Sequence, residues 1–103
     1  MDYKYRGLAP VKEVKNIDLD GVLSEDYDLE VPIWENIEKV RKLHYDQGHT
    51  IIIWTARLWW EAPKIAAFLE EHQIPYHGIK CNKGGSNEYV DDRATNVKDW
   101  RVE

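Results

Sequence analysis

The stretch Thr50-Ile-Ile-Ile-Trp54 decides the fold, because it is short, apolar and rich in β-branched side chains. Such a run predicts a buried central strand. Apolar residues recur at helical spacing on both sides of it, from Pro32 to Gly48 before it and from Glu61 to His72 after it. A buried strand between two helices is typical of a parallel α/β sheet with right-handed crossovers.

Three weaker strand candidates complete the expected sheet. Val11–Leu19 is interrupted by polar residues, whereas a buried parallel strand is usually apolar throughout. Ile74–Ile79 contains a proline, which suits an edge strand, and Glu88–Asp91 is a short last candidate. We therefore expect a three-layer, Rossmann-like α/β fold with an open parallel sheet of about four strands. The first and last strands would be central.

Length and composition limit the class of protein. The chain has 103 residues, so we expect one domain over 1–103, with residues 1–10 as an irregular N-terminal extension. A formal net charge of −5 argues against a nucleic-acid binder with a broad basic face. Cys81 is the only cysteine, which excludes an internal disulfide. The chain has neither an apolar signal core near its start nor a membrane-length apolar stretch, so we expect a cytoplasmic protein.

Polar residues follow the predicted strands at the edge where ligands bind in open α/β sheets. Asp18-Leu-Asp20-Gly21 brings two carboxylates together, and these repel one another unless a cation or shared proton intervenes. Thr55-Ala56-Arg57 offers a hydroxyl, amide donors and a guanidinium, which suit a phosphate. Asp91-Asp92 is a pair of hard oxygen ligands of the kind that Mg²⁺ prefers.

Each motif alone also has a plain structural interpretation, such as a solvated acidic turn or a threonine that caps a helix. Together they resemble the haloacid dehalogenase (HAD) superfamily over residues 13 to 97, as a compact member without a cap domain. The four motifs of that family are matched by Asp18–Leu23, by Ile51–Arg57, by Lys83, which stands eight residues before Asp91, and by Tyr89–Ala94.

The resemblance implies an Mg²⁺-dependent phosphohydrolase that cleaves phosphate monoesters through an aspartyl-phosphate intermediate. Asp18 would be the nucleophile and Asp20 the general acid and base. Thr55 would bind the phosphoryl group, and Lys83 would offset its charge. Lys80, which lies nearer the preceding strand, is the alternative lysine. The metal ligands would be Asp18, Asp20, Asp91 and Asp92.

The implied substrate is a small phosphorylated metabolite, either a sugar phosphate or a nucleotide. Ala56 and Arg57 are expected to contact its phosphate, and Arg93 adds local positive charge. Trp59 and the neighbouring Trp60 lie near the mouth of the expected site. They fit either a stacking platform for a base or sugar, or an interface between subunits of an oligomer.

Two other functions remain open. The first is a phosphatase that acts on nucleic-acid ends, for which Arg57, Lys83 and Arg93 supply local positive charge while the net charge argues against it. The second is a non-catalytic phosphate- or metal-binding module, suggested by the polar first strand and the few residues that follow Asp92.

Overall fold

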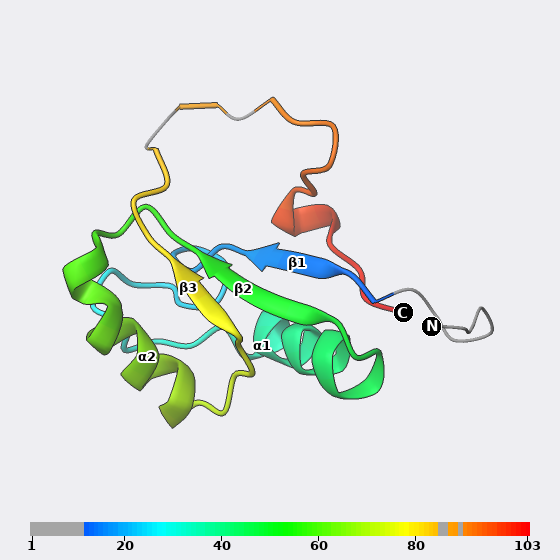
Figure 1. Ribbon diagram of the computed structural model, residues 1–103, viewed down its shortest axis with the longest axis horizontal. Helices are drawn as coiled ribbons and strands as arrows, with labels where there is room; N and C mark the ends of the chain where they lie inside the picture. Colours follow the sequence, from blue (N-terminus) through cyan, green and yellow to red (C-terminus); the bar gives the residue numbers. More distant parts are fainter. Residues whose placement is uncertain (1–11, 85–86, 89) are drawn as a thin grey trace, which may run out of the picture.

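The sheet contains three parallel strands in the order β1-β2-β3 (Figure 1). The computed structural model describes residues 12–84, 87–88 and 90–103, so the expected extension at 1–10 lies outside the described residues. The strands and helices alternate along the chain, which confirms the predicted α/β class. They are β1 (Val14–Ile17), α1 (Trp34–Arg41), β2 (Thr50–Trp54), α2 (Ala62–Glu71) and β3 (Gly78–Lys80).

β2 is the central strand, with the bounds that its apolar run predicts. Ile17 of β1 pairs with Ile53 on one side, and Ile79 of β3 pairs with Ile53 on the other. Alternate side chains of β2 point to opposite faces of the sheet. Ile51 and Ile53 are completely buried on one face, while Ile52 on the other is half-buried.

Both helices pack on the buried face of the sheet. Ile37 and Val40 of α1, and Ile65 and Leu69 of α2, are completely buried in the same core as Ile53. Two right-handed crossovers that step the same way across a sheet leave their helices on one face. The described residues therefore form two layers, and the expectation of three is corrected. The core consists of Ile17, Leu19, Leu23, Leu29, Ile37, Val40, Leu43, Ile51, Ile53, Ile65, Phe68, Leu69 and Ile74.

The first helix begins later than predicted. Pro32 forms a bridge with Ser24 instead of opening the helix, and α1 begins at Trp34. The helix continues as a π-helical turn, η1 (Lys42–Asp46), before Gly48 ends it with a φ of +76°. Glycine is favoured there because φ is positive, whereas the contact of 2.8 Å that a Cβ would make with Nζ of Lys12 could be relieved by movement of that side chain.

The predicted fourth strand at Glu88–Asp91 is not formed at its described residues; Tyr89 lies outside them. Val90 is 90% exposed and is followed by the charged Asp91 and Asp92, so this segment buries too little apolar surface to join the sheet. Residues 90–96 stand away from the sheet in Figure 1, and the chain then returns beside β1 through η3 (Val97–Asp99). β1 was expected to be central and is instead an edge strand of the three.

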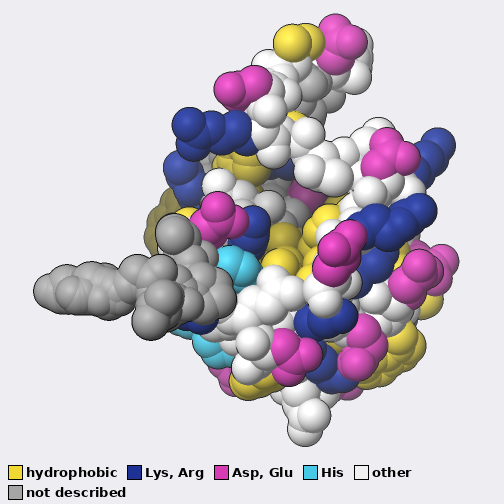
Figure 2. All heavy atoms as spheres, turned by 90° about the vertical axis from the view of Figure 1, so that its right-hand side faces the viewer, with side chains coloured by type: hydrophobic (Ala, Val, Ile, Leu, Met, Phe, Trp, Pro, Cys, Tyr) yellow, Lys and Arg dark blue, Asp and Glu magenta, His cyan; other side chains and the backbone are white. Residues whose placement is uncertain are grey.

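Histidines interact with the backbone where the strands begin. Nδ1 of His49 accepts the N–H of Glu13 at 3.0 Å, and Nδ1 of His77 accepts the N–H of Ile51 at 3.0 Å. Positive and negative side chains are interspersed on the face shown in Figure 2, where two patches of histidine are also visible. Among the described residues, no helix has the length and apolar character needed to cross a membrane.

Substitutions on the two faces of β2 should lower the free energy of unfolding by different amounts. We expect Ile51→Ala to lower the free energy of unfolding by about 2–5 kcal/mol, because it leaves a cavity in a closely packed core. Ile52→Ala, on the half-buried face, is the matched control and should lower the free energy of unfolding by clearly less than Ile51→Ala. Urea denaturation of both variants measures the difference, and equal losses would contradict burial of a single face.

Candidate functional site

The candidate site lies where β1 and β2 end. Ile17 is the last residue of β1 and pairs with Ile53, one residue before β2 ends. Asp18 and Thr55 directly follow the two strands, so the parallel register brings them to the same edge of the sheet. Thr55 is completely buried, whereas 42% of the Asp18 side chain is exposed.

A tight turn fixes the chain directly after Asp18. The carbonyl of Leu19 accepts the N–H groups of Val22, Leu23 and Ser24 at 3.2, 2.8 and 3.2 Å. Gly21 has a φ of +82°, a conformation that glycine adopts without strain. Leu19 and Leu23 are completely buried, so the turn is anchored in the core while its carboxylates stay near the surface.

Asp18 is paired with Lys83. Nζ of Lys83 donates to Oδ2 of Asp18 at 3.0 Å, and the N–H of Leu19 donates to Oδ1 at 2.8 Å. The backbone brings this lysine to the site, because the N–H of Lys83 donates to the carbonyl of Thr55 at 3.0 Å. Its ammonium also lies 4.7 Å from the centre of the Trp54 ring. Lys80 is exposed, so of the two candidate lysines it is Lys83 that contacts Asp18.

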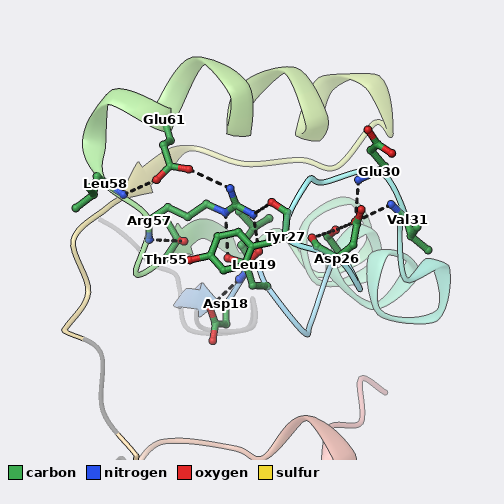
Figure 3. Close-up of polar contacts among 12 residues, drawn as sticks. Asp18, Leu19, Asp26, Tyr27, Glu30, Val31, Thr55, Arg57, Leu58 and Glu61 are labelled. Atoms are coloured by element: carbon green, nitrogen blue, oxygen red, sulfur yellow. Dashed lines mark hydrogen bonds and ion pairs between the residues drawn. The ribbon is translucent and has the colours of Figure 1, made fainter.

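Arg57 holds Asp20 with two parallel hydrogen bonds. Nε donates to Oδ2 of Asp20 at 3.0 Å and Nη2 to Oδ1 at 2.8 Å. Nη1 donates to Oε1 of Glu61 at 3.0 Å, and Nη2 also donates to the carbonyl of Tyr27. Figure 3 shows the guanidinium between Glu61 and the loop that carries Tyr27. The hydrogen bonds to Asp20 raise the pKa of Arg57, although burial opposes them.

The two carboxylates are thus held by two different cations. β1 ends at Ile17, so Asp18 and Asp20 lie beyond the strand, where its alternation no longer applies. Arg57 was predicted to contact phosphate, but it is only 4% exposed and its hydrogen bonds go to groups of the protein. Glu61 was not predicted as part of the site. Its spacing of four residues from Arg57 was the available sequence signal, since such residues are neighbours on a helical turn.

The loop between Gly21 and Pro32 is organised by the carboxylate of Asp26. Oδ1 accepts the N–H groups of Glu30 and Val31 at 2.8 and 3.0 Å, and the hydroxyl of Ser24 at 3.1 Å. The bond from Val31 is the largest of the causes that lower the pKa of Asp26. The loop holds Tyr27 with its ring 4.7 Å from the Arg57 guanidinium while 76% of the residue is exposed.

The other predicted site residues are exposed, and those near the C-terminus lie in a segment away from this edge. Asp91, Asp92 and Arg93 are exposed in the segment that stands away from the sheet, where the N–H of Arg93 donates to Oδ1 of Asp91 at 2.7 Å. Ala56 is exposed directly after Thr55. Trp59 begins the short helical turn η2 (Trp59–Glu61) and is 67% exposed, with its ring edge-on to that of Trp60.

The edge fits a magnesium ion in part. Mg²⁺ is commonly held by one or two carboxylates together with water and substrate phosphates, and the half-exposed carboxylate of Asp18 suits it. Of the other predicted ligands, Asp20 is paired with Arg57, and Asp91 and Asp92 are exposed in the segment that stands away from the sheet in Figure 1. Within the part of the chain that the structure describes, no three histidine, cysteine, aspartate or glutamate side chains gather closely enough to hold a metal.

Comparison with known proteins supports the fold. The crystal structure of a structural-genomics target from Vibrio cholerae matches with a TM-score of 0.72 and 28% sequence identity, over 85% of this chain and 85% of that chain. No family model matches the chain, and neither does any curated protein. The chain therefore shares its open parallel α/β fold with the Vibrio cholerae protein.

The hydrogen bonds of Asp26 predict a pH-dependent stability. Because its pKa is lowered from 3.8 in the folded state, the carboxylate stabilises the fold above pH 3.8. That contribution disappears as the pH falls through the folded-state pKa. We expect Asp26→Asn to be less stable than the native protein at pH 7, with a difference that narrows below pH 3.8.

Urea unfolding at a series of pH values measures this difference. Asp28→Asn is the matched control, because Asp28 is an exposed carboxylate of the same loop. A destabilisation by Asp26→Asn that stays constant down to the lowest pH would contradict the role of the charge.

Proposed function

We propose that the protein is an Mg²⁺-dependent phosphohydrolase of the HAD superfamily, without a cap domain, that cleaves small phosphate monoesters through an aspartyl-phosphate on Asp18. The observation that carries the proposal is the ion pair of 3.0 Å between Asp18 and Lys83, beside the buried Thr55. Each of these residues lies in a sequence motif that resembles the corresponding HAD motif.

The order of steps follows from the chemistry of these side chains. A carboxylate oxygen of Asp18 attacks phosphorus, and the bond from phosphorus to the leaving oxygen breaks. Asp20 gives that oxygen a proton. Asp20 then takes a proton from a water molecule, which attacks the phosphorus of the aspartyl-phosphate, releases phosphate and restores Asp18.

Thr55 and Lys83 serve the phosphoryl group in this proposal. In this proposal the completely buried Thr55 hydroxyl, which accepts the N–H of Arg57 at 3.0 Å, turns to hold a phosphoryl oxygen together with the Ala56 amide. The Lys83 ammonium balances negative charge on Asp18 and the phosphate. Asp18 and the backbone carbonyl of Asp20 would hold Mg²⁺, with Asp91 and Asp92 as further ligands suggested by the resemblance. When bound, the ion reduces the repulsion between Asp18 and the incoming phosphate.

The proposed substrate is a sugar phosphate or a nucleotide, since the short segments after Asp18–Leu23 and Ile51–Arg57 leave the edge without a cap. A single cysteine fits a reducing, cytoplasmic compartment. Cleavage of nucleic-acid ends is the weaker enzymatic candidate, because the net charge is −5 and the charges of the face in Figure 2 are interspersed.

One observation favours a second function, that of a non-catalytic phosphate-binding module. Asp91 and Asp92 are exposed in the segment that stands away from the sheet, and the described residues hold no group of three metal-binding side chains. This alternative predicts phosphate binding without turnover.

The role of Asp18 can be measured directly. We expect phosphate release from a panel of sugar phosphates and nucleotides that requires Mg²⁺, stops with EDTA and is abolished by Asp18→Asn, because an amide is a far weaker nucleophile than a carboxylate. Release that survives the substitution would overturn the proposed mechanism. Binding of phosphate or Mg²⁺ without any turnover would favour the non-catalytic module.

Two lysines close together in sequence provide a matched comparison. Lys83→Ala should lower kcat by about 10²–10³, the loss typical for removing one group that stabilises charge in the transition state. Lys80→Ala should leave kcat nearly unchanged, since Lys80 is exposed at the end of β3. Steady-state kinetics on the best substrate of the panel measures both, and a greater loss for Lys80→Ala would reverse the assignment.

A further inference from the structure

We infer that Arg57 is a positioning residue for Asp20, and that it acts on the reaction only through that carboxylate. This inference rests on the proposed function, because it gives Arg57 a part in the proton transfer assigned to Asp20. The sequence motif alone suggests a different role, in which Arg57 contacts the phosphate of the substrate.

The hydrogen bonds of Arg57 argue against phosphate contact. A guanidinium has five N–H donors in a planar fork, and one edge of the fork matches the two oxygens of a carboxylate. Nε and Nη2 present that edge to Asp20, while Nη1 donates to Glu61. A phosphate could gain the same two parallel bonds only by displacing Asp20.

The two partners of this ion pair differ in solvent exposure. The Arg57 side chain is 2% exposed, whereas 37% of the Asp20 side chain faces solvent. The guanidinium therefore supports Asp20 from inside the protein. A carboxylate has about four lone-pair positions, so the two bonds to Arg57 leave positions that can carry the transferred proton.

Arg57 is itself held from two further segments. Oε1 of Glu61 accepts from Nη1, and Oε2 of Glu61 accepts the N–H of Leu58 at 3.1 Å, which ties the guanidinium to the start of η2 (Figure 3). Nη2 also donates to the carbonyl of Tyr27, which lies in the loop between Gly21 and Pro32. The bonds to Glu61 and Tyr27 thus fix the guanidinium, and the guanidinium in turn orients Asp20.

The leaving group offers a readout that separates this role from a general effect on stability. An alkyl alcohol leaves as a strongly basic oxygen and needs a proton from the enzyme, whereas 4-nitrophenolate leaves without one. A variant that misplaces Asp20 therefore loses activity on alkyl phosphates and keeps most of its activity on aryl phosphates. kcat/KM reports the steps up to departure of the leaving group, so the later hydrolysis of the intermediate does not mask the difference.

The experiment measures kcat/KM with Mg²⁺ for glycerol phosphate and for 4-nitrophenyl phosphate. Arg57→Ala should lower the value for glycerol phosphate by about 10²-fold and the value for the aryl ester by only a few-fold. Arg57→Lys keeps the charge without the fork and should show the same preference in weaker form. In an Asp20→Asn background, Arg57→Ala should have little further effect, because the two residues act as one unit.

Arg41 supplies the matched control. It also bridges segments, donating from Nε to the carbonyl of Gln73 at 3.1 Å and from Nη2 to that of His72 at 2.6 Å, but it contacts neither Asp18 nor Asp20. Arg41→Ala should change the two esters equally. Circular dichroism and thermal unfolding of each variant identify any that do not fold, and Arg57→Lys then carries the comparison.

The outcomes separate the two proposals. Equal losses on both esters for the folded Arg57 variants, or additive effects with Asp20→Asn, would overturn the positioning role while turnover that depends on Asp18 still supports the proposed function. A wild-type protein that turns over neither ester nor any phosphate of the panel would overturn both.

Discussion

The parallel register between β1 and β2 is the constraint on which the site depends. Pairing of Ile17 with Ile53 brings Asp18 and Thr55 to the same edge of the sheet. The other contacts extend from that edge, since Lys83 is hydrogen-bonded through its backbone to Thr55. A shift by one residue would turn every side chain of β1 to the other face, so the buried Ile17 fixes the position of the nucleophile candidate as well as the core.

The two ion pairs at this edge differ in ways that suit different tasks. Arg57 is almost completely buried, and breaking a buried pair leaves an uncompensated charge inside the protein. The pair of Asp18 with Lys83 is exposed to a similar degree, with 42% of the Asp18 side chain and 10% of the Lys83 side chain exposed, against 37% for Asp20 and 2% for Arg57. The two pairs differ in geometry, since Arg57 binds Asp20 through two parallel hydrogen bonds, which fix the plane of the carboxylate, whereas Lys83 binds Asp18 through one.

Strands with an uninterrupted apolar sequence were predicted more accurately than strands with polar or charged residues. The bounds of β2 were predicted correctly because Thr50–Trp54 is an uninterrupted apolar run. The polar first strand was predicted as Val11–Leu19, whereas β1 covers Val14–Ile17, and the charged Glu88–Asp91 is not a strand at its described residues. The role of Arg57 was harder to predict, because a long side chain can reach either a ligand or a neighbouring loop. The hydrogen bonds of Arg57 to Asp20, Glu61 and Tyr27 are visible only in the folded arrangement.

The histidines at the opposite edge of the sheet connect side chains to the backbone where its first strands begin. Nδ1 of His49 and Nδ1 of His77 each accept a backbone N–H, so the neutral ring carries its hydrogen on Nε2 and a single tautomer is selected. The two rings therefore serve as acceptors for backbone donors at the amino edge, and a side chain without a ring nitrogen at either position would leave that N–H without this acceptor.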